Sequence, residues 1–449
     1  MYFQYPRSVI PFVAITHRQH SHHAQEVRRG PRGAVDYEDA EVRGVRGNQQ
    51  DHRRVEEAPS PRASFNYHLR EQAPEQKENK NRPWPVMDDQ EYYEKVHGGW
   101  IGRVAGSHLG APLEFRPYSY IQRRYCGGGK SEITSFVKRV DPNAVNDDEI
   151  YQIAGLLAIE GHGAGLTAKD IATEWNARLY RKQFTAERVA LKNIGAGIYP
   201  PESAAEEHGN VYYDAVGGQM KADIWGLVAP NCPEMAAHYA WIDGSVAHQG
   251  IGIDGEVFVA VMIANAFGIS DIEELVHKSL LVLPKQSEYR LFVEQCLVIH
   301  ENHASWRDGR AALMQAWSKA RKSLLREARS VRRWIFLRFL HPLHVLPNAG
   351  IIALSLLYGQ DHEDRFGRPL CLAAMMGYDT DCNCGNLGTI MGTILGEKGI
   401  PAEWKAPLQD RFNTYVKGYE SWRITDLSRR ICDAGKMLLR ASYPEHAIG

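Results

Sequence analysis

Aspartates lie close together at two distant points of the 449-residue sequence, each time just before an apolar stretch. The first point is the run NDDE, residues 146–149, and the second is the segment GYDTDCNCGN, residues 377–386. Closely spaced carboxylates bind hard divalent cations through oxygen, occupy the positive N-terminal end of a helix, or form an acidic loop. Each segment by itself fits all three interpretations.

The two segments together favour a metal site. Both are predicted to begin helices, with Asn146 as a cap of the first and Asp381 as a cap of a helix over 381–396. They are about 230 residues apart, and if the two helix starts meet they gather four carboxylates. The four are Asp147, Asp148, Asp379 and Asp381. Such a cluster repels itself unless cations are present, and it suits one or two Mg²⁺ ions.

Other polar residues border apolar stretches and are weaker candidates. Glu114 ends the segment GSHLGAPLEF, and His248 lies in the Gly-rich segment DGSVAHQGIGIDGE, residues 243–256. His344 and Asn348 flank the start of a further apolar stretch, and Tyr378 precedes the second aspartate pair. Each of these side chains fits a structural role as well as a contact with substrate.

Three of these segments carry a family resemblance. In their order and spacing, GSHLGAPLEF, NDDE and GYDTDCNCGNLGTIMGTILG resemble the ADP-ribosylglycohydrolase family, whose usual forms are G-D-x-L-G-x-x-x-E, T-D-D-T and D-T-D-T. The likeness covers about residues 95–400 and extends to a microbial branch with a late Y/W-D-T-D-C-N motif. It implies an all-α fold, a compact orthogonal multi-helix bundle around a binuclear Mg²⁺ centre, in which Mn²⁺ sometimes replaces Mg²⁺. It also implies hydrolysis at C1″ of ADP-ribose attached to protein or to another acceptor.

The resemblance also assigns residues by position. The implied metal ligands are Asn146, Asp147, Asp148, Asp379, Asp381 and Cys382. The implied catalytic residues are Glu114, Asp148 and Asp379, with Glu114 as the general base or the group that aligns the water. The expected substrate contacts are Ser107, His248, His344, Asn348 and Tyr378.

The chain departs from the family pattern at three positions. Ser107 replaces an aspartate, and Asn146 and Cys382 stand where the family has threonine. An asparagine carbonyl still suits Mg²⁺, whereas sulfur is a poor ligand for a hard cation, so Cys382 is expected beside the metal more than on it. These departures lead us to expect a remodelled metal site and a substrate that differs from ADP-ribose.

Three alternative functions remain at this point. The first is hydrolysis of a small nucleoside-like riboside in place of an ADP-ribosyl protein. The second is a metal-dependent phosphohydrolase that uses the same acidic pairs. The third is a non-catalytic ADP-ribose-binding or scaffold protein with the same fold.

The elements that must position these residues are predicted to be helices. Residues 255–268, 348–359 and 386–396 are apolar on most sides, which is typical of helices in the middle of a helical protein. Gly102, Gly106 and Gly110 recur every four residues and permit close helix contact. Short alternating β-branched runs are scarce, so we expect an all-α catalytic domain over residues 87–449.

Residues 1–86 differ from the rest, because they are rich in Arg and His and lack apolar periodicity after residue 15. Such a segment buries too little surface to offset its chain entropy, so we expect a disordered N-terminal extension. Met87 is also a plausible alternative start of the protein.

The composition limits the classes of partner molecule that we expect. Lys and Arg total 53 against 54 Asp and Glu, so net charge gives no reason to expect nucleic acid or an anionic membrane. One segment, 306–341, is an exception with ten Lys or Arg, and it is either a basic surface helix or a polyanion contact. The seven cysteines are scattered, which favours reduced thiols. We find no apolar run near the ~18 residues of a membrane span and recognise no secretory signal. Together these observations favour a cytoplasmic protein.

Overall fold

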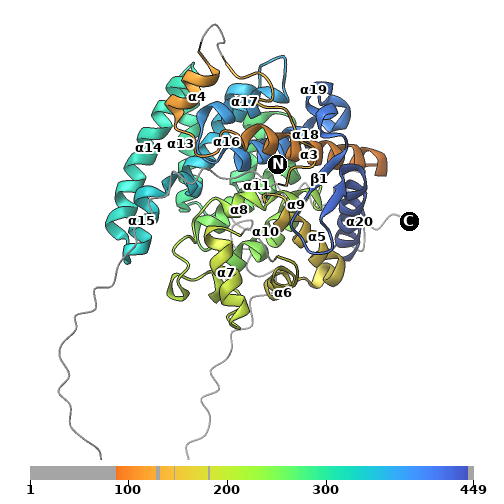
Figure 1. The fold of residues 1–449 in the computed structure, drawn as a ribbon. Helices are drawn as coiled ribbons and strands as arrows, with labels where there is room; N and C mark the ends of the chain where they lie inside the picture. Colours follow the sequence, from red (N-terminus) through yellow and green to blue (C-terminus); the bar gives the residue numbers. More distant parts are fainter. Residues whose placement is uncertain (1–86, 128–131, 146, 180–182, 443–449) are drawn as a thin grey trace, which may run out of the picture. The chain divides into compact units, whose positions relative to one another are not determined.

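The computed structural model describes residues 87–127, 132–145, 147–179 and 183–442. The prediction for residues 1–86 therefore lies outside the described residues. The described chain is mostly helical, which confirms the predicted all-α class (Figure 1). The α-helices are α3 (Asp89–Gly110), α4 (Tyr118–Tyr125), α5 (Ile150–His162), α6 (Ala168–Arg178), α7 (Thr185–Gly195), α8 (Gly217–Met220), α9 (Asp223–Leu227), α10 (Pro233–Ala247), α11 (Ile251–Asn265), α12 (Ile272–Leu280), α13 (Glu288–Asn302), α14 (Trp306–Glu327), α15 (Val331–Phe339), α16 (Val345–Gly359), α17 (Gly367–Met376), α18 (Thr380–Gly399), α19 (Ala402–Lys405) and α20 (Ile424–Ser442).

Short elements complete the described chain. The 3-10 helices are η2 (Gly163–Gly165), η3 (Glu202–Ala204), η4 (Glu206–His208), η5 (His341–Leu343) and η6 (Ala406–Leu408). Strands β1 (Arg411–Asn413) and β2 (Ser421–Arg423) form a two-stranded antiparallel sheet in which Phe412 lies opposite Trp422. No helix of the described residues is both long and apolar enough to cross a bilayer.

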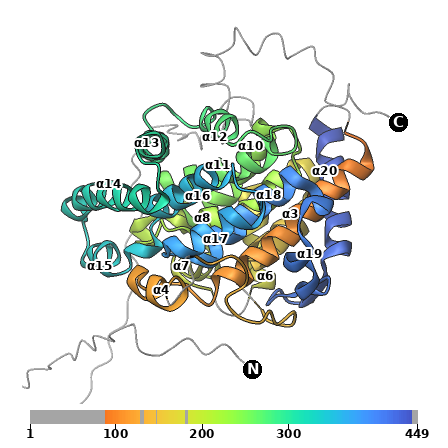
Figure 2. The ribbon, with the colours of Figure 1, turned by 90° about the horizontal axis from the view of Figure 1, so that it is seen from above.

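Helices α3 and α18 lie side by side and form the frame of the fold (Figure 2). The predicted glycine spacing explains this contact, because the glycines of α3 face the backbone of α18. A Cβ atom placed on Gly102 would lie 1.9 Å from the carbonyl oxygen of Gly388, and one on Gly106 would lie 2.0 Å from that of Cys384. The two backbones therefore touch along a line that only glycine permits. We call this line the glycine seam.

The predicted apolar helices form the core around this pair. Every residue of α16 except Tyr358 is buried, and α11 is buried continuously from Gly255 to Asn265. Both helices begin before the predicted apolar stretches, α11 at Ile251 and α16 at Val345. The turn at Gly250, whose φ is 51°, precedes α11, and the His344 side chain accepts a hydrogen bond from the Leu346 N–H at the start of α16.

Two predicted helix starts need correction. Helix α5 begins at Ile150, so the acids of the NDDE run precede the helix and do not occupy its first turn. Helix α18 begins at Thr380 with Asp379 at the N-cap position, and Asp381 lies in its first turn, although we expected Asp381 as the cap. The physical reason in the first case is a turn, closed by a hydrogen bond from Ile150 N–H to the Asp147 carbonyl (3.3 Å), that turns the acids inward.

The basic segment 306–341 forms α14 and α15, which lie at one edge of the described helices (Figure 2). Trp306, Leu313 and Trp317 anchor α14 in the core, and Phe336 and Leu337 are the buried apolar residues of α15. The charged residues of both helices occupy mainly the remaining faces. The segment therefore packs through apolar anchors while it presents a basic surface.

Candidate metal centre

Five of the predicted residues come together where the chain leaves α3, enters α5 and enters α18. Atoms of Glu114, Asp379 and Asp381 that could bind a metal all lie within 4.8 Å of one another. The corresponding atoms of Asp148, Asp381 and Cys382 form a second such group. Asp381 belongs to both groups and joins them. We call these five residues the carboxylate centre.

A turn and a backbone hydrogen bond hold the two sides of the centre together. Gly377 and Tyr378 both have positive φ, 84° and 69°, and Tyr378 is a residue type that rarely adopts this conformation. The turn leads from α17 to Asp379 at the start of α18. The N–H of Phe115 donates to the Tyr378 carbonyl (3.0 Å), which fixes Glu114 beside Asp379. Unfavourable backbone geometry of this kind is often found at functional sites.

Asn348 supports the same turn from α16. Its Oδ1 accepts hydrogen bonds from Asp379 N–H (3.3 Å) and from Asn383 Nδ2 (2.8 Å). Its Nδ2 donates to the carbonyls of Pro342 (2.8 Å) and His344 (2.9 Å). The amide is therefore engaged at both ends and positions Asp379, and the predicted contact of Asn348 with substrate stays a prediction.

A buried arginine holds the other side of the centre, and sequence reasoning missed it. The Arg103 guanidinium lies 3.3 Å from Asp148, 3.6 Å from Glu149 and 3.3 Å from Asp223. Ser107, one turn further along α3, donates to Glu149 (2.9 Å). Burial lowers the pKa of Arg103, but the three carboxylates more than offset this and raise it above its usual value. Ser107 thus supports the acidic turn, and its predicted contact with substrate stays a prediction.

The carboxyl groups of the centre carry pKa values raised above normal. Burial is the main cause for Glu114, followed by the charges of Asp379, Asp147 and Asp148. Burial also raises the pKa values of Asp148, Asp379 and Asp381. Asp147 is half-buried and acts on the centre through its charge, whereas Asn146 lies outside the described residues.

The donor set fits a hard divalent cation. Asp379 Oδ1 is buried and has no hydrogen-bond partner among the described residues, as expected for an oxygen arranged for a metal. Clustered carboxylate oxygens suit Mg²⁺, Mn²⁺ or Ca²⁺ better than softer metals. Cys382 does not alter this preference. Burial and the neighbouring aspartates raise the pKa of its thiol, and Sγ lies 3.5 Å from Asp148 Oδ1 as a hydrogen-bond donor.

The two histidines that we predicted to contact substrate each lie beside a buried carboxylate outside the carboxylate centre. His248 Nε2 lies 2.9 Å from Glu187 Oε1, and its Nδ1 lies 3.2 Å from the Tyr213 carbonyl. His344 Nε2 lies 3.2 Å from Asp214, which also binds Arg333. Neither histidine belongs to the groups that make up the carboxylate centre. Their predicted contact with substrate stays a prediction.

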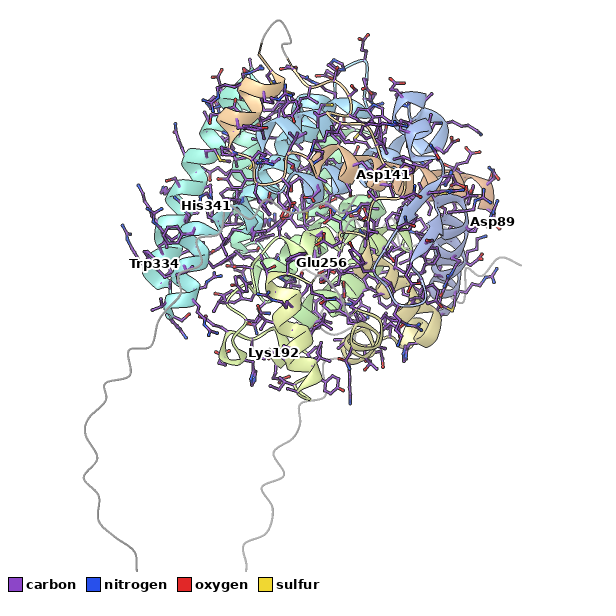
Figure 3. All side chains as sticks on the ribbon, viewed as in Figure 1. Asp89, Asp141, Lys192, Glu256, Trp334 and His341 are labelled. Carbon is purple, nitrogen blue, oxygen red and sulfur yellow. The ribbon has the colours of Figure 1, made fainter. Side chains whose placement is uncertain are left out.

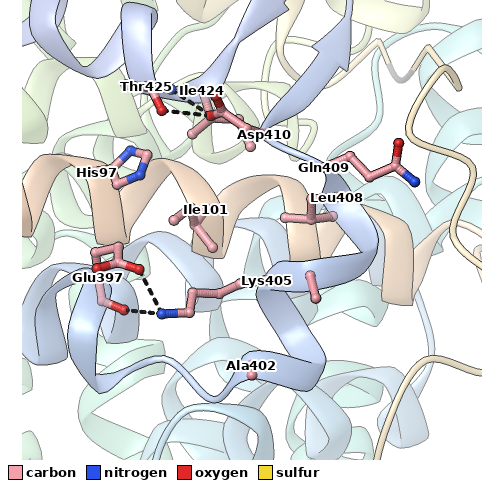
Figure 4. Close-up of a pocket in the computed structure, with 11 residues that line it drawn as sticks. His97, Ile101, Glu397, Ala402, Lys405, Leu408, Gln409, Asp410, Ile424 and Thr425 are labelled. Carbon is pink, nitrogen blue, oxygen red and sulfur yellow. Dashed lines mark hydrogen bonds and ion pairs between the residues drawn. The ribbon is translucent and has the colours of Figure 1, made fainter.

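A separate open cleft of about 400 Å³ lies between α3, α19, η6 and the start of α20 (Figure 4). Its charged groups are engaged in hydrogen bonds or ion pairs. Lys405 Nζ lies 2.6 Å from Glu397, and Asp410 accepts hydrogen bonds from Thr425 N–H and hydroxyl, both 2.8 Å. This pairing leaves the cleft without a cluster of carboxylates like that of the centre.

Comparison with known proteins gives a match to a family model and a similar solved structure. Residues 88–437 match the model of the ADP-ribosylglycohydrolase family. No curated protein matches the sequence. Among solved structures, a chain described as an ADP-ribosylglycohydrolase-related protein complex is similar, with 17% sequence identity and a TM-score of 0.48. The alignment covers 78% of this chain and 99% of that chain.

Proposed function

The chain belongs to the ADP-ribosylglycohydrolase family, and from this membership we propose a Mg²⁺-dependent hydrolase that cleaves the C1 glycosidic bond of an ADP-ribosyl group. Membership by itself supports activity of the glycosyl hydrolase type. The observation that carries the finer proposal is the pair of ligand groups that share Asp381. Two such groups side by side support two Mg²⁺ ions, with Mn²⁺ as the alternative metal.

Under this proposal Asp147, Asp148, Asp379 and Asp381 hold the cations, with Glu114 beside them. A divalent cation held by these residues would lower the pKa of a water molecule and polarise ribose hydroxyl oxygens. Cys382 stays a protonated thiol that donates to Asp148. It therefore orients a ligand without being one.

Glu114 is the proposed general base. Its carboxylate belongs to the ligand group that also contains Asp379 and Asp381, so it lies within reach of a water molecule held at the centre. Glu114 takes a proton from the water, whose oxygen bonds to C1 while the leaving group departs with the electrons of the broken bond. The leaving group then takes up the proton that Glu114 received, which regenerates the Glu114 carboxylate and leaves a free hydroxyl on C1. The carboxylates of the centre also stabilise the positive charge that develops on the sugar.

The test replaces single proposed ligands and measures metal binding and product release in separate experiments. Asp148→Asn and Asp381→Asn should each weaken Mg²⁺ binding in calorimetry by about 100-fold or more, since loss of a mere supporting residue costs 10–100-fold. Both should also abolish Mg²⁺-dependent release of ADP-ribose from ADP-ribosyl arginine or serine peptides. Asp410→Asn, the same change in the separate cleft, is the matched control and should alter neither.

The products decide between the alternatives. Release of ribose from a plain nucleoside favours the small-riboside hydrolase, and release of inorganic phosphate favours the phosphohydrolase. Binding of ADP-ribose without turnover of any substrate favours the non-catalytic protein. Survival of Mg²⁺-dependent hydrolysis in both aspartate variants refutes the assignment of the metal centre.

A further inference from the structure

Helix α15 presents an apolar stripe to solvent. Four large apolar side chains recur at the i, i+3, i+4 and i+8 spacing of one helix face, and they are Val331, Trp334, Ile335 and Phe339. Their exposed fractions are 76%, 42%, 43% and 62%. They are four of the thirteen exposed large apolar residues in the described part of the chain, so they are gathered on one short helix. Trp334 lies at the outer edge of the molecule (Figure 3). We call these four residues the α15 stripe.

The opposite face of α15 already holds the helix in place. Phe336 and Leu337 are buried and cluster with Ala215. The Arg333 guanidinium donates to Asp214 Oδ1 (2.6 Å) from the same side. The α15 stripe is therefore not needed for packing of the helix, and its exposure calls for another explanation.

Positive charge borders the α15 stripe. Residues 319–338 contain eight Lys or Arg and a single Asp or Glu. Arg332 and Arg338 are exposed on α15, and Arg329 is exposed directly before it. The Arg338 guanidinium lies 5.4 Å from the ring centre of Phe339. None of the three forms an ion pair with another described residue, so their charges are available to a partner. We call these three residues the flanking arginines.

Apolar side chains beside unpaired cations match an anionic lipid surface. Helices that lie in a membrane interface insert an apolar face at the boundary of headgroups and acyl chains, while cations attract anionic headgroups. Tryptophan is enriched at this boundary. In Figures 1 and 2, α15 lies at the outer edge of the described helices, toward the side opposite α20, where a flat surface can approach it.

The charge of the α15 surface makes other occupants less suitable. A second copy of the chain in a symmetric dimer would bring the same arginines face to face. Residues 1–86 also contain more Lys and Arg than Asp and Glu, so they do not complement it. A nucleic acid would match the cations, but it stacks on aromatic rings and leaves the aliphatic Val331 and Ile335 without a contact of their own kind.

We propose that the α15 stripe and the flanking arginines bind the surface of anionic membranes. The proposal is independent of the proposed function, because it uses no residue of the carboxylate centre. It resolves the two interpretations of the basic segment 306–341 in favour of a polyanion contact. The near-zero net charge of the whole chain gave no reason to expect an anionic membrane, because that sum averages over this local excess of Lys and Arg.

Co-sedimentation of the full chain with phosphatidylcholine vesicles, with and without phosphatidylserine, tests the proposal. The chain should bind the vesicles that contain phosphatidylserine, and added salt should weaken this binding. Arg332→Gln together with Arg338→Gln should weaken it about 25-fold, about fivefold for each lost charge. Trp334→Ser should weaken it about tenfold or more, because the indole no longer enters the lipid boundary.

Matched control variants carry the same changes elsewhere. Arg440→Gln removes an exposed charge from α20, and Trp241→Ser removes a half-exposed tryptophan from α10. Both should leave vesicle binding unchanged. All the replaced side chains are exposed, so the variants should fold, and an unchanged urea midpoint checks this.

Several results would overturn the membrane surface. These are no vesicle binding by the full chain, equal binding to both kinds of vesicle, or equal weakening by Arg440→Gln and the α15 double variant. A dimer in analytical ultracentrifugation that Trp334→Ser dissociates, without vesicle binding, would assign the stripe to a second copy. Binding of single-stranded RNA that falls in the double variant, again without vesicle binding, would assign the arginines to nucleic acid.

Discussion

Replacement of Gly102 by alanine tests the glycine seam most directly. The new Cβ would lie 1.9 Å from the Gly388 carbonyl oxygen and 2.4 Å from its carbonyl carbon, both of them backbone atoms that cannot rotate away. Ordinary contact begins at 3.4 Å, so α3 and α18 would have to move apart by about 1.5 Å, the difference between 3.4 and 1.9 Å.

The expected cost follows from this displacement. Overpacking of a core costs about 1–3 kcal/mol and occasionally more. A gap of only 0.5–1 Å already forfeits roughly a quarter to a half of each van der Waals contact. Alanine returns at most about 1 kcal/mol through its higher helix propensity. We therefore expect Gly102→Ala to lower the free energy of unfolding by about 3 kcal/mol or more.

Urea denaturation followed by circular dichroism measures this change, and Gly161→Ala is the matched control. Gly161 lies in α5 with nothing within 4 Å of an added Cβ. Alanine there should stabilise the protein by about 0.5–1 kcal/mol through helix propensity alone. A value for Gly102→Ala within about 0.5 kcal/mol of the wild type would refute the backbone contact between α3 and α18.

Two further predictions concern charge. Arg103→Leu should lower the free energy of unfolding by about 3–5 kcal/mol, because it leaves three buried carboxyl groups without their cation. Lys398→Met, at an exposed ion pair with Glu94, should leave the urea midpoint unchanged, and equal effects of the two changes would contradict this account. The carboxyl groups of the centre have raised pKa values, so the folded state binds more protons than the unfolded state. The stability of the metal-free protein should therefore fall as pH rises above about 4, and Mg²⁺ should raise the melting temperature more at about pH 7.5 than at about pH 5.5. A Mg²⁺ effect independent of pH would contradict it.

The sequence was sufficient to predict the acidic members of the centre and the class of fold. Aspartates before two apolar stretches, and glycines four residues apart, are local patterns with a direct physical meaning. The glycine spacing of α3 indicated a close helix contact, but not that its partner is α18. Of the four carboxylates expected to meet, Asp148, Asp379 and Asp381 belong to the two ligand groups and Asp147 does not, and the helix start at Ile150 was misplaced.

The residues that neutralise and orient the centre were not predictable in the same way. Arg103 follows Gly102 in α3, and an arginine in a glycine-rich apolar helix is the one signal that could have indicated a buried ion pair. Asp223, which completes that pair, lies 120 residues away in a short helix with no motif of its own. The pairings of His248 and His344 are equally long-range, with Glu187 and Asp214. Such partners depend on tertiary packing, which no local pattern encodes.

The glycine seam also affects how this protein can diverge. Every substitution of a glycine adds at least a Cβ atom, and along the seam that atom meets backbone, so there is no small first step away from the present sequence. Exposed side chains such as Arg338 of α15 meet no such barrier. We therefore expect the frame and the surface to change at unequal rates, with the carboxylate centre tied to an almost immutable frame. Single substitutions can accumulate on the surface while the arrangement of the carboxylates stays the same.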